Sequence, residues 1–149
     1  MIHVKVESKI QSIPARLIDR AAQAALTNQS AEGDLTVVLT DGARLRQLNR
    51  QYLGVDAPTD VLSFPASETD PERGTRYLGD ILISIPAADE QARSAGHPLE
   101  SEVQLLVVHG VLHLLGHDHA AAKDKTEMWK AQSEVLQSLG LGNVRVREQ

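Results

Sequence analysis

Hydrophobic and polar residues alternate over residues 2–6, which is typical of a β-strand with one solvent-facing side. His3 lies on the polar side of this strand. The apolar positions that follow repeat with either a helical or a strand period. They predict helices at 14–27, 41–52, 86–95, about 99–115 and 122–139, and strands at 35–39, 61–64 and 77–85. This order predicts a single α+β domain over residues 1–149, with a mixed sheet of about four strands packed with helices.

Several of the predicted boundaries rest on particular residues. Pro14 lies early in the first turn of the first helix, and Asp41 can cap the second. Pro65 is expected to end the strand before it, and the polar residues 67–76 then predict a mobile loop. Gly140 is a natural C-cap for the last helix.

Composition narrows the class of protein. The chain has 149 residues, no cysteine and a net charge of −5. The absence of cysteine excludes disulfides and thiolate metal sites and fits a cytoplasmic protein. No apolar run approaches the roughly 18 residues of a membrane span. The negative charge argues against broad electrostatic binding of nucleic acid, so we expect neither a DNA nor a membrane partner. Any RNA that the protein binds must therefore contact a local patch of its surface.

Three histidines carry the clearest chemical signal. His109, His113 and His119 follow the spacing H-x3-H-x2-G-x2-H within a very apolar segment, with Gly116 between the last two. Two imidazoles four residues apart lie on one face of a helix and can reach one ion at the roughly 2.0–2.1 Å typical of zinc–nitrogen bonds. The glycine lets the chain turn, so that a third imidazole arrives from outside the helix. Three protein ligands and one open position describe a catalytic zinc.

Two features of this motif leave alternatives open. His117 also follows the turn, but the long zinc-protease signature matches His109, His113, Gly116 and His119 position for position and favours His119. Asp118 either accepts an N–H from a ligand imidazole or caps the next turn. In the protease the residue after the first histidine is the glutamate base, and here it is Gly110. Either the metal site therefore acts without a general base on this helix, or an acidic side chain from elsewhere in the fold serves as that base.

Asp80 is the acid that we expect to face the site, because it interrupts an otherwise apolar strand and buried carboxylates are seldom left unpaired. The segment 56–60 is expected to be a turn. Other side chains are expected to have structural roles: Arg44, Arg46 and Arg50 on a solvated helix face, His97 in a loop, and Met128 and Trp129 in the core. Arg73 and Arg76, in the predicted loop, could instead contact a substrate.

The segment His-Gly-Val-Leu-His-Leu-Leu-Gly-His-Asp-His at 109–119 resembles the zinc motif of the YbeY family of bacterial endoribonucleases. The segments Asp-Ala-Pro-Thr-Asp-Val-Leu-Ser-Phe-Pro at 56–65 and Leu-Gly-Asp-Ile at 78–81 agree with it, in the family's order and spacing. The resemblance covers nearly the whole chain. It implies one zinc ion on His109, His113 and His119, and cleavage of single-stranded RNA. It also implies a role in maturation of small-subunit ribosomal RNA and in ribosome quality control, and it places Asp80 at the site.

One position departs from the family's pattern. Several members carry arginine directly after the tyrosine that precedes the Asp-x-Pro-Thr segment, whereas Tyr52 is followed here by Leu53. Leucine cannot supply the bidentate phosphate contact of a guanidinium, and Arg50, two positions earlier on a helix, points to another face. Two other functions therefore stay in view: a metal-dependent hydrolase of peptides or small molecules, and a ribosome-associated binding module stabilised by zinc.

Overall fold

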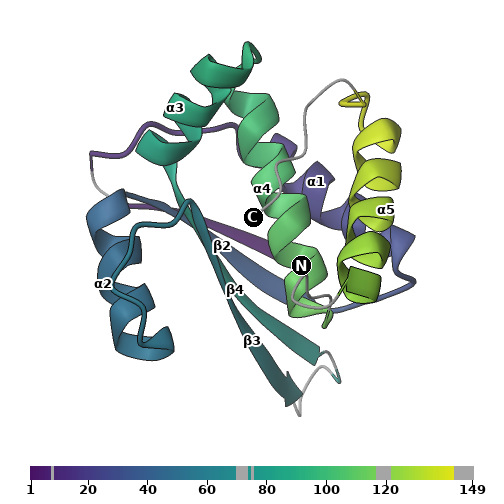
Figure 1. Ribbon diagram of the computed structural model, residues 1–149. Coiled ribbons are helices and arrows are strands. Elements are labelled where there is room, and N and C mark those ends of the chain that lie inside the picture. The colour runs from purple at the N-terminus through teal and green to yellow at the C-terminus, as the bar shows by residue number, and fades with distance from the viewer. Residues whose placement is uncertain (8, 70–73, 75, 117–121, 143–149) are drawn as a thin grey trace.

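The computed structural model describes residues 1–7, 9–69, 74, 76–116 and 122–142. Its elements follow one another in the predicted order of strands and helices (Figure 1). They are β1 Ile2–Val6, α1 Ala15–Asn28, β2 Asp34–Thr40, α2 Gly42–Leu53, β3 Val61–Thr69, β4 Arg76–Ser84, α3 Ile85–Ala95, α4 Leu99–Leu114 and α5 Ala122–Ser138.

The four strands form one mixed sheet in the order β1-β2-β4-β3. β1 pairs with β2 and β2 with β4 in parallel, while β3 pairs with β4 in the antiparallel direction. The parallel pairs are joined through helices, as a parallel connection requires. The predicted fold class, α+β with a mixed sheet of about four strands, is confirmed.

The helices cover the sheet on both sides. Figure 1 shows α2 on one side and α1, α4 and α5 on the other. Strand alternation explains the division: Leu35, Val37 and Leu39 of β2 point to the main core and are fully buried, whereas Val38 packs with α2 in a smaller cluster. α2 itself starts where predicted, because the Asp41 carboxylate accepts a hydrogen bond from the Arg44 backbone N–H at 2.9 Å.

α4 is the central helix of the fold. Twelve of its 16 residues are buried, which is the pattern of a helix surrounded by protein on nearly all sides. It contacts α1, α3 and α5 as well as strands β3 and β4. The residues at its C-terminal end are therefore held rigidly from several directions.

Two predictions about single residues are wrong. Pro65 does not end its strand, because β3 is an edge strand and continues to Thr69 with a shift of register between Pro65 and Glu68. A proline lacks an N–H, but it is tolerated in an edge strand or at a bulge. Trp129 is not in the core: Met128 is fully buried, while Trp129 is 36% exposed, with the Lys125 ammonium 4.9 Å from the centre of its ring. Adjacent helix positions point about 100° apart, so the two side chains cannot share one face.

Candidate metal centre

Helix α4 brings His109 and His113 together, one turn apart on the same face. Their Nε2 atoms lie 3.1 Å apart, and the two rings are edge-on with centroids 4.6 Å apart at 71°. Two nitrogens bound to one tetrahedral ion at about 2.0–2.1 Å would be separated by about 3.3 Å. The observed distance is therefore close to that between two imidazole ligands of one zinc ion.

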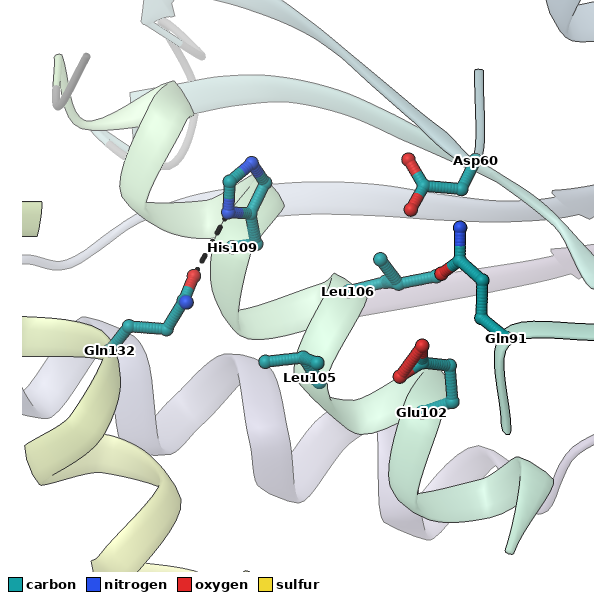
Figure 2. A pocket seen from close by; sticks show the side chains of 7 residues that line it. All are labelled: Asp60, Gln91, Glu102, Leu105, Leu106, His109 and Gln132. Carbon is teal, nitrogen blue, oxygen red and sulfur yellow. Dashed lines mark hydrogen bonds between the residues drawn. The ribbon is translucent and has the colours of Figure 1, made fainter. Parts of the chain in front are cut away.

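Gln132 of α5 determines which nitrogen of His109 is available. Its Oε1 lies 2.9 Å from His109 Nδ1, and both side chains are buried (Figure 2). A carboxamide oxygen can only accept a hydrogen bond, so His109 Nδ1 must donate. In the neutral imidazole this leaves Nε2 without a proton and directed toward His113. Partners of this kind hold metal-binding histidines in the required tautomer and orientation.

The third predicted ligand, His119, lies outside the described residues, as do the alternative His117 and the neighbouring Asp118. Within the described part of the chain, no group of three or more histidine, cysteine, aspartate or glutamate side chains could hold a metal ion. The described part of the site is thus the pair on α4 with its support from α5. The complete ligand set stays a prediction.

Gly110, at the position of the protease glutamate, is where α4 approaches the sheet. A Cβ atom at this residue would lie 2.7 Å from Ile81 Cγ2, and the Gly110 carbonyl accepts a hydrogen bond from the Ser63 hydroxyl at 3.3 Å. A side chain at residue 110 would therefore point into the sheet. Glycine is required for this close approach, and the position cannot supply a base.

Asp80 lies on the face of the sheet opposite to the two histidines. The next residue, Ile81, packs against α4, so Asp80 points the other way. Its carboxylate accepts a hydrogen bond from the Tyr77 hydroxyl, which lies 2.7 Å from the hydroxyl of Thr36. Tyr77 shares this face because the β2–β4 register shifts by one residue just before Gly79. The structure does not bring Asp80 together with the histidines, and its catalytic role stays a prediction.

A pocket of about 360 Å³ opens beside the histidines. Its walls come from the end of α2, the segment before β3, β3 itself and α4. The lining residues are Asn49, Leu53, Thr59, Val61, Leu62, Ser63, Pro65, His109 and His113. None of these described residues is an arginine or a lysine. The segment 56–60, where a turn is predicted, is hydrogen-bonded to this wall: the pocket residue Asn49 donates from Nδ2 to the Ala57 carbonyl at 3.1 Å.

A second, smaller cavity of about 10 Å³ lies between His109 and the start of α4 (Figure 2). Figure 2 shows the Gln91 amide directed toward Asp60, with the buried Glu102 near Gln91 and with His109 and Gln132 at the far end. Glu102 Oε2 is 3.2 Å from Nε2 of His97, which is the loop histidine that the sequence predicts. The residues that line the cavity are Asp60, Gln91, Glu102, Leu105, Leu106, His109 and Gln132.

The predicted arginine face of α2 is exposed, as expected. Arg46 Nε lies 2.8 Å from the Asp56 carboxylate, and this hydrogen bond and charge hold the pKa of Asp56 below its usual range, with a smaller contribution from Arg50. Arg50 borders a groove with Arg46 and Asp56 rather than the histidine pocket. Arg76 is also exposed, and Arg73 lies outside the described residues.

Sequence reasoning missed the role of Gln132, although a signal existed. Gln132 follows Met128 by four residues and precedes Leu136 by four, and both of these are buried. The helical period therefore places a polar side chain on the apolar face of α5, where it needs a hydrogen-bonding partner.

No described helix is both long enough and apolar enough to cross a membrane.

Comparison with known proteins gives one consistent result. The family model described as endoribonuclease YbeY matches residues 2–140. A protein of that name from Brevibacillus brevis is 39% identical, with 95% of this chain and 96% of the relative aligned. Another from Pelotomaculum thermopropionicum is 46% identical, with 84% and 86% aligned. The solution structure of a Thermotoga maritima protein matches with a TM-score of 0.59 at 26% identity, covering 99% of this chain and 97% of that one.

Proposed function

The chain belongs to the endoribonuclease YbeY family, and we propose that it is a zinc-dependent endoribonuclease directed at single-stranded RNA. Its proposed role is maturation of small-subunit ribosomal RNA and ribosome quality control in the cytoplasm. The observation that carries the proposal is the pair of facing Nε2 atoms, 3.1 Å apart, of two histidines that line the pocket of about 360 Å³. The names of the relatives support the substrate class.

One zinc ion would be held by His109 and His113, with His119 as the proposed third ligand. When bound, zinc supplies a Lewis acid that polarises a phosphoryl oxygen and lowers the pKa of water to about 7. Gln132 keeps the proton of His109 on Nδ1 and so keeps Nε2 available. Ser63 binds the α4 backbone between the two histidines, which holds the helix at a set distance from the pocket wall.

Gly110 favours RNA over protein as the substrate. A metalloprotease of the matching signature uses a glutamate beside its first histidine as the general base. That direction is filled here by Ile81, with a Cβ at residue 110 only 2.7 Å from its Cγ2. The site therefore lacks the group that peptide hydrolysis uses in those enzymes.

The test is a comparison of His113→Ala with His3→Ala, which removes an exposed histidine on β1 far from the site. We expect His113→Ala to lose bound zinc and RNA cleavage while keeping the fold, and His3→Ala to keep all three. Metal analysis of freshly purified protein and cleavage of defined RNA with and without a chelator measure the two effects. If His113→Ala cleaves RNA as fast as the wild type, the activity belongs to a contaminant and the proposal is wrong.

A second candidate, hydrolysis of a peptide, has one observation in its favour. Among the described strands, β3 is an edge strand that pairs with β4 alone, and its residues Val61, Leu62, Ser63 and Pro65 line the histidine pocket. An extended peptide can add to such an edge through backbone hydrogen bonds. Incubating one zinc-loaded preparation with a casein panel and an RNA panel separates the candidates. Casein cleavage that His113→Ala abolishes, without RNA cleavage, would replace the nuclease proposal.

A further inference from the structure

We propose that Tyr52 and Leu53, at the end of α2, form a stacking surface for an unpaired base of the RNA bound at the histidine pocket. The inference rests on the proposed nuclease function and goes further by assigning the residues that select single strands. None of the described residues that line the pocket is an arginine or a lysine, so this lining offers no cationic side chain to a phosphate.

The exposure of this surface is unusual for the molecule. Six large hydrophobic side chains are exposed in the described part of the chain, and three of them lie within four consecutive residues. Tyr52 is 62% exposed, Leu53 is 59% exposed and Val55 is 47% exposed. An apolar group gathered at one place on a surface marks a binding site more often than scattered apolar residues do.

The backbone beneath this surface is closed by hydrogen bonds at the end of α2. Gly54 adopts a left-handed conformation, with φ of 71°, and its N–H donates to the Arg50 carbonyl at 3.2 Å. The Val55 N–H donates to the Asn49 carbonyl at 3.3 Å, which completes the helix end. The side chain of Asn49 in turn binds the Ala57 carbonyl. The exposed side chains therefore project from a hydrogen-bonded helix end, whose backbone need not rearrange when a ligand binds.

The surface is continuous with the metal pocket. Leu53 lines the pocket together with His109 and His113. The Tyr52 ring meets the Phe64 ring edge-on, with centroids 5.6 Å apart at 69°. Phe64 lies on β3 between two residues of the pocket wall, Ser63 and Pro65. By strand alternation the Phe64 side chain lies on the face of β3 opposite to Ser63, so the Tyr52 ring lies beside the pocket wall, and its neighbour Leu53 is the residue that joins this surface to the pocket lining.

An unpaired base is the occupant that this chemistry fits. Every base offers a flat π face, and stacking on an aromatic side chain binds it whatever its sequence. In a duplex both faces of each base are already covered by neighbours, so the same surface would not bind it. Stacking on Tyr52 and Leu53 would thus bind an unpaired base without an arginine or lysine from the described pocket lining, and it would favour single strands over duplexes.

The experiment measures cleavage kinetics of a defined single-stranded oligoribonucleotide by the zinc-loaded protein. We expect Tyr52→Ala to raise KM about 5- to 150-fold while kcat changes less than about twofold, because stacking stabilises substrate and transition state alike. Tyr52→Phe keeps the ring and should keep KM. Val6→Ala, an exposed apolar residue on β1 at the opposite edge of the sheet, is the control and should change neither parameter.

An abasic nucleotide identifies the contact. In a series of oligonucleotides, the abasic nucleotide is placed at each position in turn. The KM difference between wild type and Tyr52→Ala should disappear when it replaces the base that stacks on Tyr52, and at no other position. An unchanged KM in Tyr52→Ala, with the wild type active on RNA, would overturn the stacking surface and leave the nuclease proposal intact. A wild-type protein that cleaves no RNA would overturn both. A Tyr52→Ala effect on casein cleavage alone would assign the surface to a peptide.

Discussion

The hydrogen bond between Gln132 and His109 makes a quantitative prediction about metal binding. Replacing Gln132 by methionine keeps the volume in the core but removes the oxygen that lies 2.9 Å from His109 Nδ1. The imidazole is then free to carry its proton on Nε2, the form that cannot bind the ion. Loss of such a partner typically lowers metal affinity about 10- to 100-fold, which corresponds to about 1.4–2.7 kcal/mol.

Gln104 provides a matched control on the same helix as the histidines. It is 5% exposed against 2% for Gln132, and its Nε2 donates to the Glu100 carbonyl at 3.1 Å. Gln104→Met therefore also removes a hydrogen bond of a buried glutamine, with an expected loss of about 0.5–1.5 kcal/mol in the free energy of unfolding. This hydrogen bond involves neither His109 nor His113, so zinc affinity should be unchanged in Gln104→Met.

The assay has two parts. Competition with a chromophoric chelator gives zinc affinity, and urea unfolding of the metal-free protein gives stability. We expect both variants to be destabilised, and only Gln132→Met to bind zinc more weakly. Gln132→Glu, which keeps an oxygen acceptor, should bind zinc within a few-fold of the wild type. Equal zinc affinity in Gln132→Met and wild type, or an equal loss in Gln104→Met, would refute the proposed role of Gln132.

Two further predictions concern the packing of α4 and the charges of α2. Gly110→Ala places a Cβ 2.7 Å from Ile81 Cγ2. Overpacking of this kind costs about 1–3 kcal/mol, and the higher helix propensity of alanine returns about 1 kcal/mol. We therefore expect the free energy of unfolding, measured in urea, to fall by about 1 kcal/mol. Gly42→Ala, with its nearest neighbour at 3.7 Å, should lose nothing, and equal stability of the two variants would contradict the argument. Arg46→Gln should raise the pKa of Asp56 toward its usual value, as followed by NMR titration. Because the pKa of Asp56 is lowered in the folded state, its ion pair with Arg46 stabilises the protein at a pH above the unfolded-state pKa. This stabilisation is lost as the pH falls through the folded-state pKa. A pKa of Asp56 that is the same in Arg46→Gln as in the wild type would exclude the pairing.

Local periodicity was enough to predict much of this molecule. The order of elements, the mixed sheet and the cap at Asp41 follow from side-chain patterns that repeat every two or 3.6 residues. The meeting of His109 and His113 follows for the same reason, since residues four apart on a helix are neighbours. These features depend on a few consecutive residues, and the chain specifies them by itself.

Other features depend on which segments meet across the fold. The continuation of β3 through Pro65 depends on its edge position in the sheet. The face on which Asp80 lies depends on which side of β4 helix α4 packs, because Ile81 contacts α4 and Asp80 therefore points the other way. The contact between His109 and Gln132 joins residues 23 positions apart. A residue pattern indicates that a side chain is buried or needs a partner, but packing of distant elements selects the partner. The sequence by itself thus determined the histidine pair, and the tertiary structure decided what surrounds it.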